Sequence, residues 1–331
     1  MTFRDTEKHR LSPLKSQLFS AGAQQLGNYN GTPRVFCLSD NYACENLHAS
    51  IQSNALQYFA NRQIHWHDGG ECTPSNHLCC SQTFCVNTWY PYIDQPHLLK
   101  MVLTALGYQV EEMLPFELDD PLPNGKKPYV AFEWIGERNY MGERCRNNAQ
   151  RRRGQNSTSS DFAFRFMRTD GRLQIVLGEW KYTEFYADGK CMQYSRNNTD
   201  RLGIYTNSLK ANYCQIRWAQ MNIAPAALFY DPFDQLMRLQ LLASEMENFK
   251  EMRADIVSVL HIAPQANIEL INRITSPGLK AMREPTIHST WGRIVKEERF
   301  QGVYTEDLMQ IIGKYCPDKC WVDWMQVRYV W

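Results

Sequence analysis

The sequence predicts an α/β fold, in which helices flank a mixed central β-sheet and a helical region precedes the sheet. Three patterns support this class: helical periodicity up to about residue 106, strand-like runs between residues 129 and 182, and a capped helix followed by a short buried strand. The chain has 331 residues, 44% of them hydrophobic and 21% charged, as is typical of a globular protein.

Composition also limits where the protein acts. No apolar run approaches the roughly 18 residues of a membrane helix, and the N-terminal MTFRDTEKHRLSPLK lacks the apolar centre of a secretory signal. We therefore expect a cytoplasmic protein with no membrane partner, whose eleven cysteines stay reduced. The net charge of +1 is low for a DNA-binding module, so any contact with nucleic acid must depend on a local basic surface.

The N-terminal part is expected to be helical after a polar start. Residues 1–34 are rich in Gly, Ser and Gln, and we expect a flexible, loosely held arm there. Apolar residues then recur at helical spacing, which predicts helices over residues 40–59, 75–89 and 96–106. Gly107 is a suitable stop for the third of these helices.

Strands are expected in the middle of the chain. Residues 129–135 are mostly apolar, and the segments 161–168 and 173–182 flank a turn around Asp170-Gly171. Apolar residues occupy both faces of 173–182, so this strand should be buried on both sides.

The C-terminal half is expected to add a helix and a strand. Asp231 should cap a helix whose first position is Pro232, and residues 256–264 form a short buried strand. The aromatic tail after Trp321 is expected to be a strand packed on the core, with stacking on nucleobases as the alternative.

Two charged residues at the end of segment 173–182 are the strongest sign of chemistry. Glu179 and Lys181 continue one buried face of the strand, with Cα atoms roughly 6.5 Å apart. Burying a carboxylate and an ammonium is costly unless they are paired or bound to a ligand. The alternative without chemistry is a structural ion pair of Glu179 with Lys181 or Arg165.

Asp161 can join this pair in only one register of the hairpin. A two-residue turn would place Asp161 opposite Trp180, on the wrong face. A three-residue loop of residues 169–171 would instead place Asp161 opposite Glu179, with Cβ atoms ~5 Å apart. Two carboxylates at this distance can hold one hard cation such as Mg²⁺ or Mn²⁺.

The same residues carry a family resemblance. Asp161, a 17-residue gap and then Glu179-Trp180-Lys181 resembles the motif of the PD-(D/E)XK nuclease superfamily, with Ser160 at the position of the proline. Longer phrases resemble a bacterial family of restriction endonucleases within that superfamily, over roughly residues 38–275. These phrases lie at residues 74–87, 129–143, 159–166, 179–184 and 231–243.

The resemblance implies a Mg²⁺-dependent DNA endonuclease of bacterial restriction, defence or DNA processing. Asp161 and Glu179 would hold the metal, with the Trp180 carbonyl as a further ligand, and Lys181 would orient or deprotonate the attacking water. DNA is the expected partner, and a homodimer is an option because cutting both strands often needs two active sites. The expected organisation is a single restriction-endonuclease-like domain over residues 35–331, divided into a helical subregion (35–128), a catalytic core (129–275) and a C-terminal extension (276–331).

The resemblance also implies an additional acidic residue that assists the site. The candidates are Glu133, in the strand before Asp161, and Glu45, on the first predicted helix. Their alternatives are a salt-bridged strand residue for Glu133 and a solvated helix face for Glu45. Gln235 and Gln240 lie on the later helix, but a spacing of five does not share one face, so both are expected at the surface.

Segment 137–153 is basic and leads directly into Asp161. Its arginines are Arg138, Arg144, Arg146, Arg151, Arg152 and Arg153. The consecutive arginines 151–153 are the candidate nucleic-acid contacts, with a solvated loop as the alternative.

Two other functions stay open. A structural zinc protein would use the His- and Cys-rich segment, whose members are His65, His67, Cys72, His77, Cys79, Cys80 and Cys85. Their spacing matches no common zinc pattern, so zinc is disfavoured. The other alternative is a DNA-binding protein with the same fold that has lost catalysis.

Overall fold

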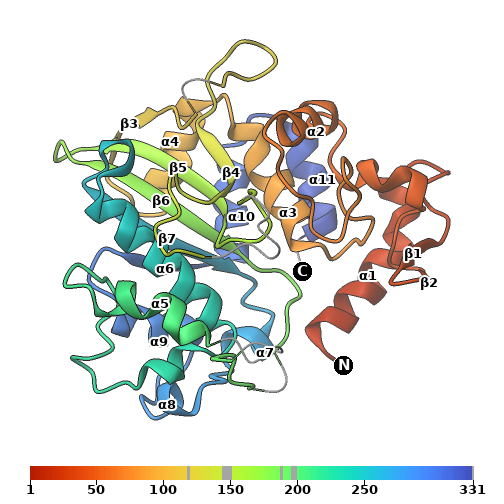
Figure 1. Ribbon diagram of the computed structural model, residues 1–331. Coiled ribbons are helices and arrows are strands. Elements are labelled where there is room, and N and C mark those ends of the chain that lie inside the picture. Colours follow the sequence, from red (N-terminus) through yellow and green to blue (C-terminus); the bar gives the residue numbers. More distant parts are fainter. Residues whose placement is uncertain (118–119, 144–150, 187–188, 195–199, 330–331) are drawn as a thin grey trace.

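The fold is a mixed α/β sandwich, as the sequence predicted, with one layer of helices on each face of a central sheet (Figure 1). The computed structural model describes residues 1–117, 120–143, 151–186, 189–194 and 200–329. Arg144 and Arg146 of the basic segment lie outside these residues. Across the described ranges, no helix combines the length and apolar character needed to cross a membrane.

Six strands of the described residues form the central sheet, in the order β3-β5-β6-β7-β8 with β4 also paired to β5. Their bounds are β3 (Val110–Leu114), β4 (Val130–Trp134), β5 (Ser160–Arg168), β6 (Leu173–Trp180), β7 (Ile256–Ala263) and β8 (Phe300–Tyr304). β3 and β4 pair with different parts of one edge of β5, and β6 pairs with its other edge. All three pairings are antiparallel. β6, β7 and β8 are parallel, so their carboxyl ends meet at one end of the sheet.

The β5–β6 hairpin adopts the register that the three-residue loop predicted. Phe162 lies opposite Gly178, and the Arg168 N–H donates to the Arg172 carbonyl at 2.9 Å. Gly171 has φ +80°, the left-handed conformation that such a loop requires. This confirms the register prediction, and it brings Asp161 opposite Glu179 just beyond the last paired residues.

The two helical layers enclose separate hydrophobic cores. Even-numbered residues such as Phe162, Phe164 and Trp180 face one layer, whose helices are α2 (Gln52–Asn61), α3 (Ser81–Trp89), α4 (Pro96–Ala105), α10 (Thr305–Lys314) and α11 (Lys319–Tyr329). Odd-numbered residues such as Ile175 and Leu177 face the other layer. Its helices are α5 (Arg201–Lys210), α6 (Phe233–Asn248), α7 (Ile268–Ile271), α8 (Pro277–Lys280) and α9 (Ile287–Ile294).

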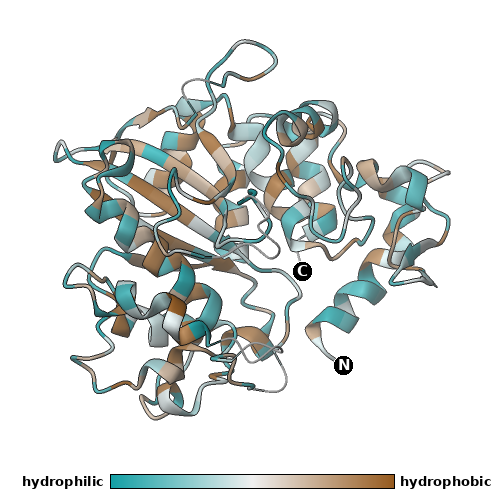
Figure 2. Ribbon diagram, in the orientation of Figure 1, coloured by the Kyte–Doolittle hydropathy of each residue, from teal (hydrophilic) through white to brown (hydrophobic). Residues whose placement is uncertain are grey.

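The N-terminal segment differs from the arm that was expected. Residues 1–34 form helix α1 (Phe3–Leu18) and a short hairpin of β1 (Gly27–Tyr29) and β2 (Thr32–Arg34). Figure 2 shows that α1 is mostly hydrophilic, which explains why its pattern suggested no packed helix. Polar contacts dock it: buried Glu7 accepts from the Tyr182 hydroxyl, and Arg10 donates to the Arg328 carbonyl on α11.

Several element boundaries were also wrong. The helix expected over 40–59 is a 3₁₀ segment, η1 (Asp40–Asn46), followed by α2. The helix expected from residue 75 begins at Ser81, and the aromatic tail forms helix α11 instead of a strand. Asp231 makes no capping bond, since Pro232 is the residue that precedes α6. The strands β3 and β8 were not predicted, because VEEML and FQGVY have weak apolar alternation.

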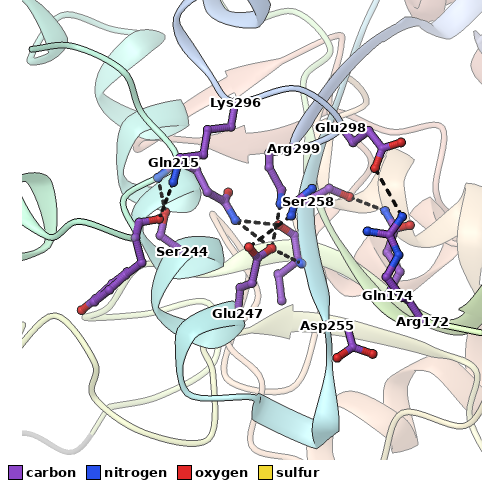
Figure 3. A network of polar contacts seen from close by, with 12 residues as sticks. Arg172, Gln174, Gln215, Ser244, Glu247, Asp255, Ser258, Lys296, Glu298 and Arg299 are labelled. Atoms are coloured by element: carbon purple, nitrogen blue, oxygen red, sulfur yellow. Dashed lines mark hydrogen bonds and ion pairs between the residues drawn. The ribbon is translucent and has the colours of Figure 1, made fainter. Parts of the chain in front are cut away.

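A polar network fastens α6 to the sheet at the hairpin end (Figure 3). Glu247 accepts the Val257 N–H of β7 at 2.8 Å and pairs with Arg299, also at 2.8 Å. Gln215 donates to Glu247 at 3.1 Å, and the Gln215 N–H donates to Ser244. These bonds hold the C-terminal part of α6 against the sheet, and the first turns of the helix lie at the opposite end.

Candidate active site

Three carboxylates lie in a row across neighbouring strands. Glu133 of β4 and Glu179 of β6 are the positions opposite Asp161 on the two sides of β5. All three line one cavity of about 280 Å³, together with Lys181 and residues from the start of α6. The cavity opens at the carboxyl end of β6, where ligands commonly bind in sheets with parallel strands.

Lys181 connects the row to α6. Its Nζ lies 2.7 Å from Glu179 Oε1 and donates to Gln235 Oε1 at 2.6 Å. Burial disfavours the ammonium, but Glu179 and the nearby Tyr186 and Glu184 outweigh it and hold the pKa of Lys181 well above its usual value. The expectation that Gln235 is a surface residue was wrong: it lines the cavity and orients Lys181.

The surroundings of Asp161 disfavour its negative charge. One of its oxygens accepts the Trp180 N–H at 2.6 Å. Burial, followed by the charges of Glu179 and Glu133, raises the pKa of Asp161 well above its usual value. Like charges in a buried row disfavour one another, and the positive charge of Lys181 offsets this only in part.

Glu133 holds a separate cluster at the other side of the cavity. The residue has φ +51° and is 1% exposed. Its carboxylate accepts from Gln82 and Ser159, each at 2.7 Å, and lies 3.4 Å from His67. Burial disfavours the imidazolium, but Glu133 outweighs it and raises the pKa of His67 to about 9. Burial opposes the Glu133 carboxylate too, yet these partners lower its pKa overall.

The cavity wall opposite the strands combines α6 with the segment 154–159. Arg238 of α6 pairs with Asp234 at 3.1 Å and donates to the Thr158 hydroxyl at 3.3 Å. Thr158 in turn donates to Glu143 through both its N–H and its hydroxyl. The sequence analysis gave no weight to Arg238, whose only signal is its position one turn after Gln235.

His261 extends the row onto β7, where it lies opposite Glu179. Its Nδ1 lies 2.8 Å from His288 Nε2 of α9, and its Nε2 is buried without a hydrogen-bond partner among the described residues. Burial, then His288 and Lys181, lowers the pKa of His261 well below its usual value. The sequence offered one signal for it, a polar residue within an apolar strand.

Other predicted residues lie elsewhere. Glu45 accepts from Ser20 through both of its oxygens and does not line the cavity. Gln240 is fully buried and donates to Gln215 at 2.6 Å, so its expected surface position was wrong. Both glutamines do lie on different faces of α6, as their spacing predicted.

The basic segment is partly used inside the protein. Arg153 donates to the Phe132 carbonyl at 2.9 Å and pairs with Glu117. Arg151 and Arg152 each donate to a backbone carbonyl. These contacts neutralise Arg153, while DNA binding by Arg151 and Arg152 stays a prediction.

The His- and Cys-rich segment does not converge on one point. His67 pairs with Glu133, the His77 Nδ1 accepts the Cys79 N–H at 2.9 Å, and Cys72 is exposed. Within the described ranges, no group of three or more His, Cys, Asp or Glu side chains is placed to hold a metal ion. The structural zinc alternative therefore has no geometric support in this part of the chain.

A hard cation needs fewer protein ligands than zinc. Mg²⁺ is commonly held by one or two carboxylates, with water and phosphate oxygens completing its shell. Asp161 and Glu179 supply two such carboxylates on adjacent strands. Two carboxylates on adjacent strands that line one cavity are a donor set of the kind that Mg²⁺ or Mn²⁺ accepts.

Comparison with known proteins identifies one family. The family model described as restriction endonuclease associating with ARP matches residues 7–330, nearly the whole chain. Neither a curated protein nor a solved structure matches the chain significantly.

Proposed function

The chain belongs to this family of restriction endonucleases associating with ARP, and on that premise we propose that it is a Mg²⁺-dependent DNA endonuclease. The family indicates a nuclease-type function. The observation that carries the proposal is the meeting of Asp161, Glu179 and Lys181 in one cavity, on neighbouring strands of the hairpin.

Each residue has a distinct role in the proposed hydrolysis of a phosphodiester. Asp161 and Glu179 would hold Mg²⁺ or Mn²⁺, which when bound lowers the pKa of a water and offsets the charge of the phosphate. Lys181 keeps a fixed positive charge beside the phosphate, because Glu179 and Gln235 hold its ammonium in place. Glu133 positions His67 at the rim of the same cavity.

Cleavage of linear, circular and branched DNA, with RNA in parallel, tests the proposal. We expect wild type to cut DNA with Mg²⁺ or Mn²⁺ but not with EDTA. Asp161→Asn and Lys181→Gln should each reduce the rate by at least about a hundredfold. Asp323→Asn and Lys280→Gln make the same charge changes at exposed positions and should cut like wild type.

Two results would overturn the assignment. Equal cutting by the folded Asp161 and Lys181 variants would move catalysis to another site. Binding of DNA by wild type without cutting in any metal would favour the binding-only alternative. Double-strand breaks whose rate rises steeply with protein concentration would support a homodimer.

A further inference from the structure

A second, larger cavity lies on the same strands as the candidate active site. It measures about 500 Å³, within the range of small-molecule pockets. Phe116 and Trp134 form its aromatic part, and the guanidinium groups of Arg62, Arg153, Arg165 and Arg253 also line it. Arg165 lies four residues after Asp161 on the same face of β5, roughly 13 Å away by strand rise.

The four arginines fall into two pairs. Two carboxylates offset Arg62 and Arg153, because Arg62 pairs with Glu117 and Asp120 and Arg153 pairs with Glu117. Arg165 donates to the carbonyl of Met252 at 2.9 Å, and within the described part of the chain neither Arg165 nor Arg253 forms an ion pair with a carboxylate. Burial, followed by the charge of Arg253, lowers the pKa of Arg165.

Arg165 and Arg253 repel each other, and Glu137, which also lines the cavity, offsets the charge of Arg165 only in part. The Arg165 Nε is buried and has no hydrogen-bond partner among the residues described. The terminal nitrogens of Arg165 donate to the carbonyls of Pro115, at 3.4 Å, and Met252, at 2.9 Å, which fixes the plane of the guanidinium. A planar guanidinium matches the geometry of phosphate oxygens. The charge at this end of the cavity therefore favours a phosphate.

The aromatic part of the cavity is suited to a base. The Phe116 and Trp134 rings meet edge to face with their centres 4.9 Å apart, and the Trp134 side chain is half-buried. The Arg153 guanidinium lies 5.4 Å from the centre of the Trp134 ring. Aromatic rings next to guanidinium planes are a common platform for unpaired nucleobases.

The segment that carries Arg253 is held in an unusual conformation. Lys250, Met252 and Arg253 have φ values of 53°, 48° and 65°, which side-chain-bearing residues rarely adopt. Buried Glu251 fastens this segment to the β4 side by accepting from Trp134 at 2.9 Å and from Tyr140 at 2.6 Å. Such strain persists where the surrounding structure enforces it, often at ligand sites.

We propose that this cavity binds one nucleotide, with its phosphate on Arg165 and Arg253 and its base against Trp134. The nucleotide is either an unpaired unit of the nucleic-acid strand that crosses the active site or a free nucleotide. The first source rests on the proposed function, whereas the recognition chemistry is the same for both.

Direct binding in EDTA separates this proposal from cleavage. The probes are a fluorescent single-stranded oligodeoxynucleotide, followed by anisotropy, and 5′-dAMP, followed by calorimetry. We expect Trp134→Ala to weaken nucleotide binding about tenfold and Trp134→Phe to retain most of it. Arg253→Gln should weaken binding. It should also reduce the slope of the logarithm of oligonucleotide affinity against the logarithm of salt concentration by about one. Arg293→Gln removes the same charge from a side chain that is 54% exposed and should bind like wild type.

Each outcome has one meaning. Loss of oligonucleotide binding in the cavity variants, without dAMP binding by wild type, assigns the site to a strand. Binding of dAMP that is lost in the same variants assigns it to a free nucleotide. The proposal is overturned if wild type binds neither probe, or if folded Arg253→Gln and Trp134→Ala bind both probes like Arg293→Gln. A failure to cleave DNA would leave these binding results intact.

Discussion

Gln235 and Gln240 lie on the same helix, yet their amides serve different parts of the molecule. Gln235 accepts from Lys181 and donates to Tyr186 at 3.0 Å and Asp231 at 3.1 Å. Gln240 joins Gln215 and the Arg299 carbonyl inside the core. Neither role follows from the helix alone, because the partners come from distant segments.

This contrast yields a paired prediction. Gln235→Leu should slow DNA cleavage about tenfold, because Lys181 loses the acceptor that orients it. Gln240→Leu should leave the cleavage rate of the folded protein near wild type but lower the free energy of unfolding by about 1–3 kcal/mol, since buried partners lose their bonds. Steady-state cleavage and urea unfolding of both variants measure the two effects. Equal loss of activity in both would contradict the positioning role of Gln235.

The residues of the row differ in how far the sequence reveals them. The shared face of Glu179 and Lys181 follows from strand alternation. The sequence allowed two loop lengths, and the structure has the three-residue loop that places Asp161 opposite Glu179. His67 and His261 reach the same region only through the packing of other elements. No local pattern carries that information.

At the scale of elements, β6 packs closely against β5 at a glycine. Gly178 lies opposite Phe162, and a Cβ at this position would be only 2.1 Å from the Phe162 ring. The ring is fully buried and lies 5.2 Å from Trp89, so it has little room to move. The close approach of these strands therefore depends on the missing side chain.

Gly178→Ala should consequently destabilise the hairpin that carries the site. We expect a loss of about 1–3 kcal/mol in the free energy of unfolding, as for other overpacked cores. Gly292→Ala is the matched control, because the new Cβ on α9 would meet Phe300 at an ordinary 3.7 Å. That change should be neutral or stabilise the protein by up to about 1 kcal/mol. Urea unfolding compares the two; wild-type stability in Gly178→Ala would refute the packing argument.

Long, strongly patterned elements were predictable, whereas short edge elements were not. The strands β5, β6 and β7 lie within a few residues of their predicted bounds, because each carries apolar residues on both faces. β3 is a short edge strand with two exposed glutamates, and nothing in its composition favours a strand. Between η1 and α2, the His48 N–H donates to the side chain of Asn87 at 2.8 Å, a contact with a distant segment that no local pattern indicates.

At the scale of the whole molecule, buried histidines couple the fold to pH. His77 is 9% exposed, and its Nδ1 accepts the Cys79 N–H. Burial, then Lys8 and Arg4, lowers the pKa of His77 to about 4, and burial lowers that of His288 to about 4 as well. The composition gave no indication of this, because it depends on how α1 docks on the rest of the chain.

The sign of the pH effect follows from these shifts. A histidine with a folded pKa near 4 and an ordinary value of 6.5 binds a proton more readily when the chain is unfolded. Its contribution to stability is therefore complete above pH 6.5 and is lost as the pH falls towards 4. One such group costs up to about 1.4 kcal/mol for each pH unit in this window. His67 acts in the opposite sense, because its raised pKa stabilises the fold below 6.5 and this contribution fades as the pH rises through about 9.

We therefore expect wild type to lose stability steeply between pH 6.5 and pH 4, and His77→Gln to lose less. The glutamine can still accept the Cys79 N–H but does not titrate, so at pH 5 the variant should retain up to about 2 kcal/mol that wild type loses. Urea unfolding at pH 7.5 and pH 5 measures the difference, with the exposed His9→Gln as a control that should follow wild type. If His77→Gln and wild type lose stability in parallel, His77 binds its proton as readily in the folded protein as in the unfolded chain. The docked helix α1 would then tolerate a charged imidazole, contrary to what its contacts indicate.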